Sequence, residues 1–268
     1  MVRQVSSVAV TERRAPATAV ATGAVRLTGV SKVFGRGSSA VQALDQVSLE
    51  VMPGEFTCLI GASGCGKSTL LALVAGLEQP TVGEVSTSGG RVAVMFQEPA
   101  LFPWLTAAGN VEMALRARGA GKAERRQRAA ELLRTVNLGD FGGKRPHELS
   151  GGMRQRVALA RALAQDADIL LMDEPFGALD AMTRDLLHDE IDRIRAGRAF
   201  TVLFVTHNVQ EAVRLGDRVV VMSSRPGRVI DEFAVDIERP RRIDSAPVAE
   251  LAAQITDRLR EEMSRDAR

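Results

Sequence analysis

The strongest chemical signal in the sequence is a glycine-rich run that ends in Lys67 and two hydroxyl residues. An apolar run over residues 56–60 precedes it, and a helical pattern begins at Lys67. Glycines let backbone N–H groups converge on phosphate oxygens, and a helix N-terminus adds partial positive charge. The G-x-x-x-x-G-K-[ST] pattern therefore predicts a phosphate-binding loop, with the Lys67 ammonium on the β- and γ-phosphates and the Ser68 hydroxyl on magnesium. The predicted loop consists of Gly61, Ala62, Ser63, Gly64, Cys65, Gly66, Lys67, Ser68 and Thr69.

An acidic pair, Asp173 and Glu174, follows the apolar run over residues 168–172. Two carboxylates directly after a buried strand are costly unless they hold a metal ion or polarise water. Asp173 is predicted to contact magnesium through water, and Glu174 to be the general base that activates the attacking water. The alternative, that the pair caps a following helix, is disfavoured because Pro175 and Gly177 interrupt the chain at once.

Gln97 and His207 also stand close behind predicted strands, over residues 92–96 and 201–205. Ligands of open α/β sheets bind outside the carboxyl ends of the strands. A single histidine is more often structural than catalytic, but this one is predicted to share a sheet edge with three other polar sites. We therefore expect Gln97 and His207 to belong to the same site as the phosphate loop.

Ser150, Gly151 and Gly152 open a predicted helix over residues 152–164 and form a second anion-binding helix terminus. One nucleotide does not require two such cradles. A head-to-tail dimer would use both, with the Ser150 loop of each copy covering the phosphates held by the other. An ordinary N-capped helix would explain the serine but not the paired glycines.

The elements that must position these residues alternate between strand and helix from about residue 25. Such alternation predicts an α/β fold around a mostly parallel sheet, with an inserted helical subdomain at about residues 98–155. Residues 1–24 are predicted to be a flexible tail, and residues 25–240 to form the main domain. Residues 241–268 are predicted to form a helical tail that packs on its own domain, since its apolar residues recur at helical spacing. These residues are Val248, Leu251, Ile255 and Leu259.

Composition excludes several classes of protein. Proteins that bind nucleic acid usually carry a strongly basic face, and the net charge here is only +2. No nucleic-acid partner is therefore expected. Two cysteines, Cys58 and Cys65, make no disulfide framework and favour a reducing compartment. The apolar runs are far shorter than the roughly 20 residues that cross a bilayer. A redox switch at Cys65, close to Lys67 and a helix N-terminus, is the less favoured alternative to a position that tolerates a small side chain.

At these residues the sequence resembles the ATPase subunits of ABC transporters, over about residues 25–240. The matching motifs are Walker A (Gly61–Ser68), the glutamine loop (Gln97), the signature (Leu149–Met153), Walker B (Ile169–Asp173) with Glu174, the Asp loop (Ala178, Leu179, Asp180) and the switch His207. The resemblance implies a P-loop NTPase (RecA-like) core with an antiparallel β segment near the N-terminus, and ATP and Mg²⁺ as cofactors. It also implies that Gln97 contacts the metal, that His207 contacts the γ-phosphate and that Asp180 borders the nucleotide. Since the chain has no tyrosine, Phe34 takes the place of the aromatic residue that stacks on adenine.

The run from Phe96 to Thr106 resembles the importer group for nitrate, aliphatic sulfonates and taurine more closely. The expected partners are a second copy of the chain in an ATP-dependent homodimer, transmembrane permease subunits and, indirectly, a solute-binding protein. The expected location is the cytoplasmic face of the membrane, as a peripheral subunit, and aliphatic sulfonates including taurine are favoured over nitrate. Trp104 could contact the permease or, alternatively, lie in the core.

Three other functions are less favoured. ATPases of DNA repair carry long coiled-coil insertions, and no sustained heptads lie between Ser68 and Ser150. Translation factors of this type carry two cassettes, and a small-molecule kinase has no use for the Ser150 segment. An importer ATPase for another small solute also remains an alternative.

Overall fold

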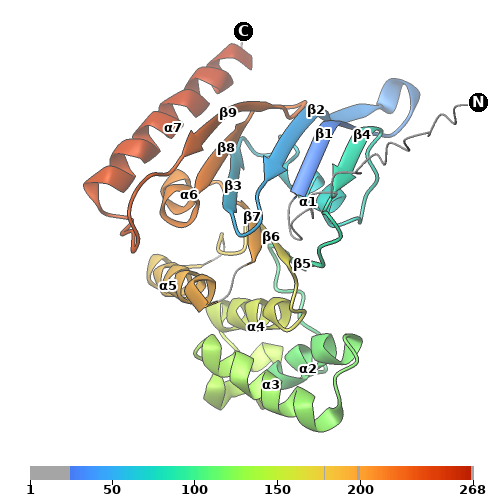
Figure 1. Cartoon of the computed structure of the whole chain (residues 1–268), viewed down its shortest axis with the longest axis vertical. Helices are drawn as coiled ribbons and strands as arrows, with labels where there is room; N and C mark the ends of the chain where they lie inside the picture. Colours follow the sequence, from blue (N-terminus) through green and yellow to red (C-terminus); the bar gives the residue numbers. More distant parts are fainter. Residues whose placement is uncertain (1–24, 178, 198–199, 267–268) are drawn as a thin grey trace, which may run out of the picture.

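The computed structural model describes residues 25–177, 179–197 and 200–266. Two sheets and a layer of helices make up this part of the chain (Figure 1). The predicted N-terminal tail over residues 1–24 lies outside the described residues, as does Ala178 of the Asp loop.

The central sheet has six strands in the order β5-β6-β7-β3-β8-β9. The first five are parallel to one another and β9 is antiparallel to β8, so the predicted mostly parallel sheet is confirmed. The strands are β3 (Phe56–Gly61), β5 (Val92–Met95), β6 (Ile169–Asp173), β7 (Thr201–Val205), β8 (Arg218–Met222) and β9 (Val229–Ala234).

A second, antiparallel sheet of order β2-β1-β4 packs beside it, as the resemblance implied. It consists of β1 (Val25–Phe34), β2 (Val41–Val51) and β4 (Val82–Ser86). Helix α1 (Lys67–Val74) shares one hydrophobic cluster with this sheet and with one face of the central sheet.

The continuous apolar strands of the central sheet are divided between two cores by the twofold alternation of strand side chains. In β7, Val202 and Phe204 face one hydrophobic cluster, and Leu203 and Val205 face the other. The first cluster carries the remaining helices: α2 (Ala107–Ala117), α3 (Lys122–Thr135), α4 (Gly151–Leu163), α5 (Ala181–Gly197), α6 (Val209–Leu215) and α7 (Ala246–Asp266). Burial on both faces explains why these strands lack polar alternation.

Helices α2, α3 and α4 form the layer at one end of the molecule, where the inserted helical subdomain was predicted (Figure 1). The C-terminal helix α7 lies at the other end, against α6. Val248 and Ile255, two of the residues at helical spacing, are fully buried there. No helix in the described ranges is both long and apolar enough to cross a membrane.

The prediction that Trp104 could lie in the core is wrong, because its side chain is 67% exposed. Its ring contacts Phe102 at a centroid distance of 5.5 Å. The predicted strand over residues 92–96 also ends one residue early, and Phe96 is exposed. Both residues lie where the chain leaves the sheet for the helical layer.

Candidate nucleotide site

The parallel strands deliver the predicted polar residues to a single edge of the sheet. The ends of β3 and β6 are continued by the phosphate loop and by Glu174, and the ends of β5 and β7 by Gln97 and His207. Because parallel strands have their carboxyl ends at one edge, this convergence follows from the topology.

The phosphate loop joins β3 to α1, and Gly66 at the N-cap of α1 has a φ of 101°. A Cβ at Gly66 would stand 2.7 Å from Leu44 Cδ2 and 2.8 Å from the Ala43 carbonyl oxygen. Strand β2 therefore backs the loop so closely that only glycine fits, and Gly66 holds the left-handed conformation that glycine tolerates best.

The Lys67 ammonium is buried and donates to the carbonyl oxygens of Gly61 (2.9 Å) and Ala62 (3.0 Å). The Cys65 sulfur lies 3.7 Å from it. These hydrogen bonds hold the Lys67 ammonium on the inner side of the phosphate loop, where a bound phosphate would contact it. Phosphate oxygens would replace the carbonyls as partners.

The Ser68 hydroxyl lies close enough to the Asp173 carboxylate, where α1 packs on β6, to stabilise its charged form. Burial raises the pKa of Asp173, while the Ser68 hydroxyl and the Lys67 charge oppose the rise. A hydroxyl and a carboxylate side by side are oxygen donors of the kind that Mg²⁺ prefers, so the residues fit this ion. Within the described ranges no group of three or more His, Cys, Asp or Glu side chains is placed to hold a metal ion.

Glu174 and His207 come together from neighbouring strands, with 3.1 Å between Glu174 Oε2 and His207 Nδ1. Glu174 has a φ of 42°, and its N–H donates to the Val205 carbonyl (2.9 Å). The Glu174 backbone is thereby tied to β7, the strand that carries His207. The His207 side chain is 64% exposed, so the pair faces solvent at the sheet edge.

Buried hydrogen bonds hold the segment around His207 in place. The Thr206 hydroxyl donates to Glu211, whose other carboxylate oxygen lies 2.7 Å from His188 Nε2. Asn208 caps α6 by accepting from the Glu211 N–H (3.1 Å). The sequence analysis missed Thr206, His188 and Glu211, and a polar residue between an apolar strand and the histidine was the available signal.

Gln97 lies at this edge, but its side chain is exposed. Its carbonyl oxygen accepts from the buried Gln155 Nε2 (3.0 Å), and Gln155 also donates to the carbonyl of Pro175. Gln155 thus ties the stretch after β5 to the stretch after Glu174. Sequence analysis missed it, and a polar residue on an otherwise buried helix face was the signal.

Phe34 ends β1 opposite Val41 of β2, the strand that backs Gly66. Its ring is 40% exposed and carries the Lys32 ammonium 4.8 Å above its centroid. The ring is thus accessible on the strand pair behind the phosphate loop.

The signature residues lie in the helical layer rather than at the sheet edge. Ser150 caps α4, and its hydroxyl accepts from the Met153 N–H (3.2 Å), as the N-cap reading predicted. The Asp180 carboxylate likewise accepts a hydrogen bond from the Thr183 N–H (2.9 Å) at the start of α5. This bond lowers the pKa of Asp180.

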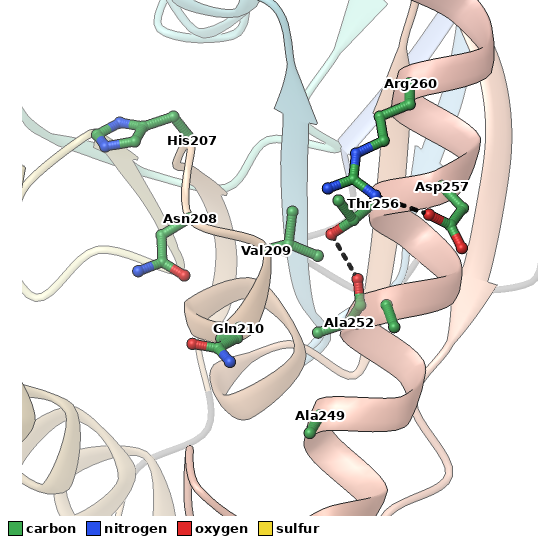
Figure 2. Close-up of a pocket in the computed structure, with 10 residues that line it drawn as sticks. His207, Asn208, Val209, Gln210, Ala249, Ala252, Thr256, Asp257 and Arg260 are labelled. Carbon is green, nitrogen blue, oxygen red and sulfur yellow. Dashed lines mark hydrogen bonds and ion pairs between the residues drawn. The ribbon is translucent and has the colours of Figure 1, made fainter.

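A separate pocket of about 540 Å³ lies between the segment from His207 to Gln210 and α7. Figure 2 shows the His207 ring pointing away from α7, and Thr256, Asp257 and Arg260 on the helix side. His207 thus lines this pocket as well, while its ring is turned away from α7 and contacts Glu174 at the sheet edge.

Together the fold and these contacts define a nucleotide-binding α/β protein of the P-loop class. The family model described as ABC transporter matches residues 44–177. A chain 47% identical over 236 residues, covering 86% of each sequence, is the aliphatic sulfonates import ATP-binding protein SsuB 1 of Mesorhizobium japonicum. The nitrate import ATP-binding protein NrtD of Synechocystis is 43% identical over 220 residues, which are 80% of this chain and 83% of that one.

Among solved structures, a dimeric structure of the ATP-binding cassette MJ0796 bound to ADP and Pi is 36% identical, with a TM-score of 0.72. The matched region covers 80% of this chain and 100% of the MJ0796 chain. The chain belongs to the ABC transporter family, and it is an ATP-hydrolysing cassette of that family.

Proposed function

We propose that this chain is the ATPase subunit of an importer for aliphatic sulfonates, including taurine, and that it acts as a head-to-tail dimer on separate membrane subunits. The observation that carries the catalytic part is the contact between Glu174 and His207, next to the Ser68–Asp173 pair.

In the proposed site, the loop N–H groups and Lys67 hold the β- and γ-phosphates of ATP, and Phe34 stacks on adenine. Ser68, Gln97 and Asp173 would hold Mg²⁺, Asp173 through water. The ion would neutralise charge on the β- and γ-phosphates when bound.

Glu174 is proposed to act on the attacking water. Its carboxylate accepts one water proton while the water oxygen bonds to the γ-phosphorus and the bond from that phosphorus to the bridging oxygen of ADP breaks. The products are ADP and inorganic phosphate. His207 holds the Glu174 carboxylate by its Nδ1 atom, which leaves Nε2 free to contact the γ-phosphate.

The dimer is supported by the placement of the two helix N-termini. The N-terminus of α1 meets the phosphate loop at the sheet edge, whereas the α4 N-terminus with Ser150, Gly151 and Gly152 opens in the helical layer (Figure 1). A second copy in reverse orientation would bring its Ser150 terminus to the phosphates and its Asp180 to the same border. The related cassette MJ0796 is dimeric with ADP and Pi bound.

The test is Glu174→Gln, which keeps the shape of the side chain but removes the base. ATP binding should persist, turnover should fall by about 100-fold or more, and size-exclusion chromatography with ATP should show doubled mass. A variant that stays monomeric with ATP at high concentration would contradict the dimer, and one that hydrolyses ATP at the parent rate would contradict the role of Glu174.

The permease partner is supported by the exposed Trp104, whose ring contacts the half-buried Phe102 and which follows Gln97 at the start of the helical layer. An amphipathic tryptophan that is 67% exposed suits contact with another subunit. Such docking would place the chain at the cytoplasmic face of the membrane, with a solute-binding protein reached only through the permease.

The sulfonate assignment is supported by the sulfonate import relative at 47% identity against 43% for the nitrate import relative. A deletion strain should fail to grow on an alkanesulfonate or taurine as sole sulfur source and should grow on sulfate. Unimpaired growth on every sulfonate, in a strain with no second system, would remove the solute assignment and leave the ATPase assignment intact.

A further inference from the structure

A turn that the nucleotide site does not use, residues 223–228, lies directly beside the phosphate loop. It follows β8, and β8 pairs with β3 so that Met222 is opposite Gly61. The chain therefore leaves β8 at the same level at which the phosphate loop leaves β3.

Hydrogen bonds fix the turn to itself and to β2. The Ser223 hydroxyl accepts from the Arg228 N–H (2.9 Å) and lies 3.0 Å from the Pro226 carbonyl oxygen. The Gly227 N–H donates to the Ala43 carbonyl (2.9 Å). The turn is thus anchored on the strand that also backs Gly66.

The turn also packs against the phosphate loop, so closely that no side chain fits at Gly227. A Cβ at Gly227 would stand 2.0 Å from the Cys65 carbonyl oxygen, so the two backbones are in direct contact. Any displacement of the turn would therefore be transmitted to the loop at Cys65.

Arg225 projects from this anchored turn onto Gly64. Its Nε donates to the Gly64 carbonyl (3.3 Å), and its Nη2 would lie 3.3 Å from a Cβ at Gly64. The guanidinium is otherwise exposed, whereas Arg228 of the same turn forms an ion pair with Asp45 of β2.

Holding the Gly64 carbonyl also orients the next N–H. A trans peptide is planar, so the Gly64 carbonyl and the Cys65 N–H point in opposite directions. The Cys65 N–H makes only a 3.3 Å bond to the Ala62 carbonyl within the loop. Fixing the carbonyl from outside therefore keeps this donor turned toward the inside of the loop, where the phosphates bind.

We infer that Arg225 is a positioning residue for nucleotide binding: it clamps Gly64 and adds a positive charge beside the phosphate loop. The inference rests on ATP binding by the loop itself. It predicts an effect on nucleotide affinity rather than on the chemical step, because Arg225 touches neither Glu174 nor His207 among the described contacts.

Three variants test the inference: Arg225→Gln, Arg225→Lys and, as a matched control in the same turn, Arg228→Gln. KM and kcat for MgATP, equilibrium binding of a fluorescent ATP analogue and melting temperature are measured for each. Arg225→Gln should raise KM and the dissociation constant about threefold to tenfold, the size expected for one exposed charge-assisted hydrogen bond, with kcat within about twofold. Arg225→Lys should recover part of the loss, and Arg228→Gln should match the parent.

An unchanged KM in Arg225→Gln would overturn the inference. An equal rise in Arg228→Gln, or a loss confined to melting temperature and kcat, would also overturn it, since either result marks a merely structural turn. Failure of the parent protein itself to bind the analogue would instead contradict nucleotide binding by the phosphate loop.

Discussion

Gly152 of the signature segment lies so close to Thr183 of α5 that a Cβ at position 152 would stand 2.4 Å from the Thr183 Cγ2 atom. Thr183 cannot easily turn aside, because its hydroxyl donates to Asp180 (2.7 Å). The contact joins the start of α4 to the start of α5, so the two segments proposed to face a second copy are set by one van der Waals contact.

Gly152→Ala should therefore destabilise the protein, although alanine is ordinarily the better helix residue by roughly 1 kcal/mol. Overpacking of this kind costs about 1–3 kcal/mol, and it should also weaken the ATP-dependent dimer. Urea denaturation and size-exclusion chromatography with ATP measure both effects.

The matched rescue is the double change Gly152→Ala with Thr183→Ser, which keeps the hydroxyl on Asp180 and removes the obstructing methyl group. It should recover most of the lost stability and dimer. If Gly152→Ala is as stable as the parent, or if the double variant is no better than the single one, the contact does not set the two segments.

Lys67→Ala should weaken nucleotide binding by about 10-fold to 100-fold, as expected for removal of a buried charge matched to phosphate. Binding of a fluorescent ATP analogue measures the change. Lys144→Ala is the control, since the Lys144 side chain forms an exposed ion pair with Glu148 (3.2 Å) as its only described contact. Equal affinity in Lys67→Ala and the parent would be incompatible with the phosphate loop assignment.

His207→Ala should lower ATP turnover by about 100-fold while binding changes by no more than a few fold. The reason is that His207 contacts Glu174. Its loss frees the base and removes only one proposed contact to the γ-phosphate, whereas Lys67 and the N–H groups of the phosphate loop remain. The exposed His147→Ala should behave as the parent does. Parallel losses of binding and turnover in His207→Ala would show instead that the residue supports the site as a whole.

Asp217→Asn should lower stability at neutral pH, with a pH dependence of defined sign. Burial by itself raises the pKa of Asp217, but hydrogen bonds from Arg195, the Phe56 N–H and Arg239 lower it below its ordinary value. The stabilisation is therefore present above the unfolded pKa of about 4 and is lost as pH falls through the lower folded value. About a third of the side chain is exposed, so screening limits the expected loss at pH 7 to about 1 kcal/mol.

Urea denaturation of the parent and Asp217→Asn at pH 7 and at pH 3 checks this expectation. The difference in unfolding free energy should shrink at the lower pH, because below about pH 4 Asp217 is protonated in the unfolded chain and the folded state then loses its advantage as protonation proceeds. Asp140→Asn, at an exposed position, is the control. A difference that is constant across this pH range would show that the charge of Asp217 is not what stabilises the fold.

Much of the site was determined by the sequence alone. The phosphate loop, Asp173, Glu174 and His207 each follow an apolar run, and parallel strands bring such positions to one edge whatever the details of packing. The same periodicity arguments predicted the helical layer and the buried face of α7, because local hydrophobic spacing reports directly on burial.

Only the tertiary structure decided which of these residues are in contact and which neighbouring side chains hold them in position. The Glu174–His207, His188–Glu211 and Arg225–Gly64 contacts join residues far apart in the chain. Such contacts depend on side-chain reach across packed elements, and no residue pattern along one segment encodes the distance to another. The sequence therefore predicted which polar residues meet at the sheet edge, whereas packing determined the contacts among them.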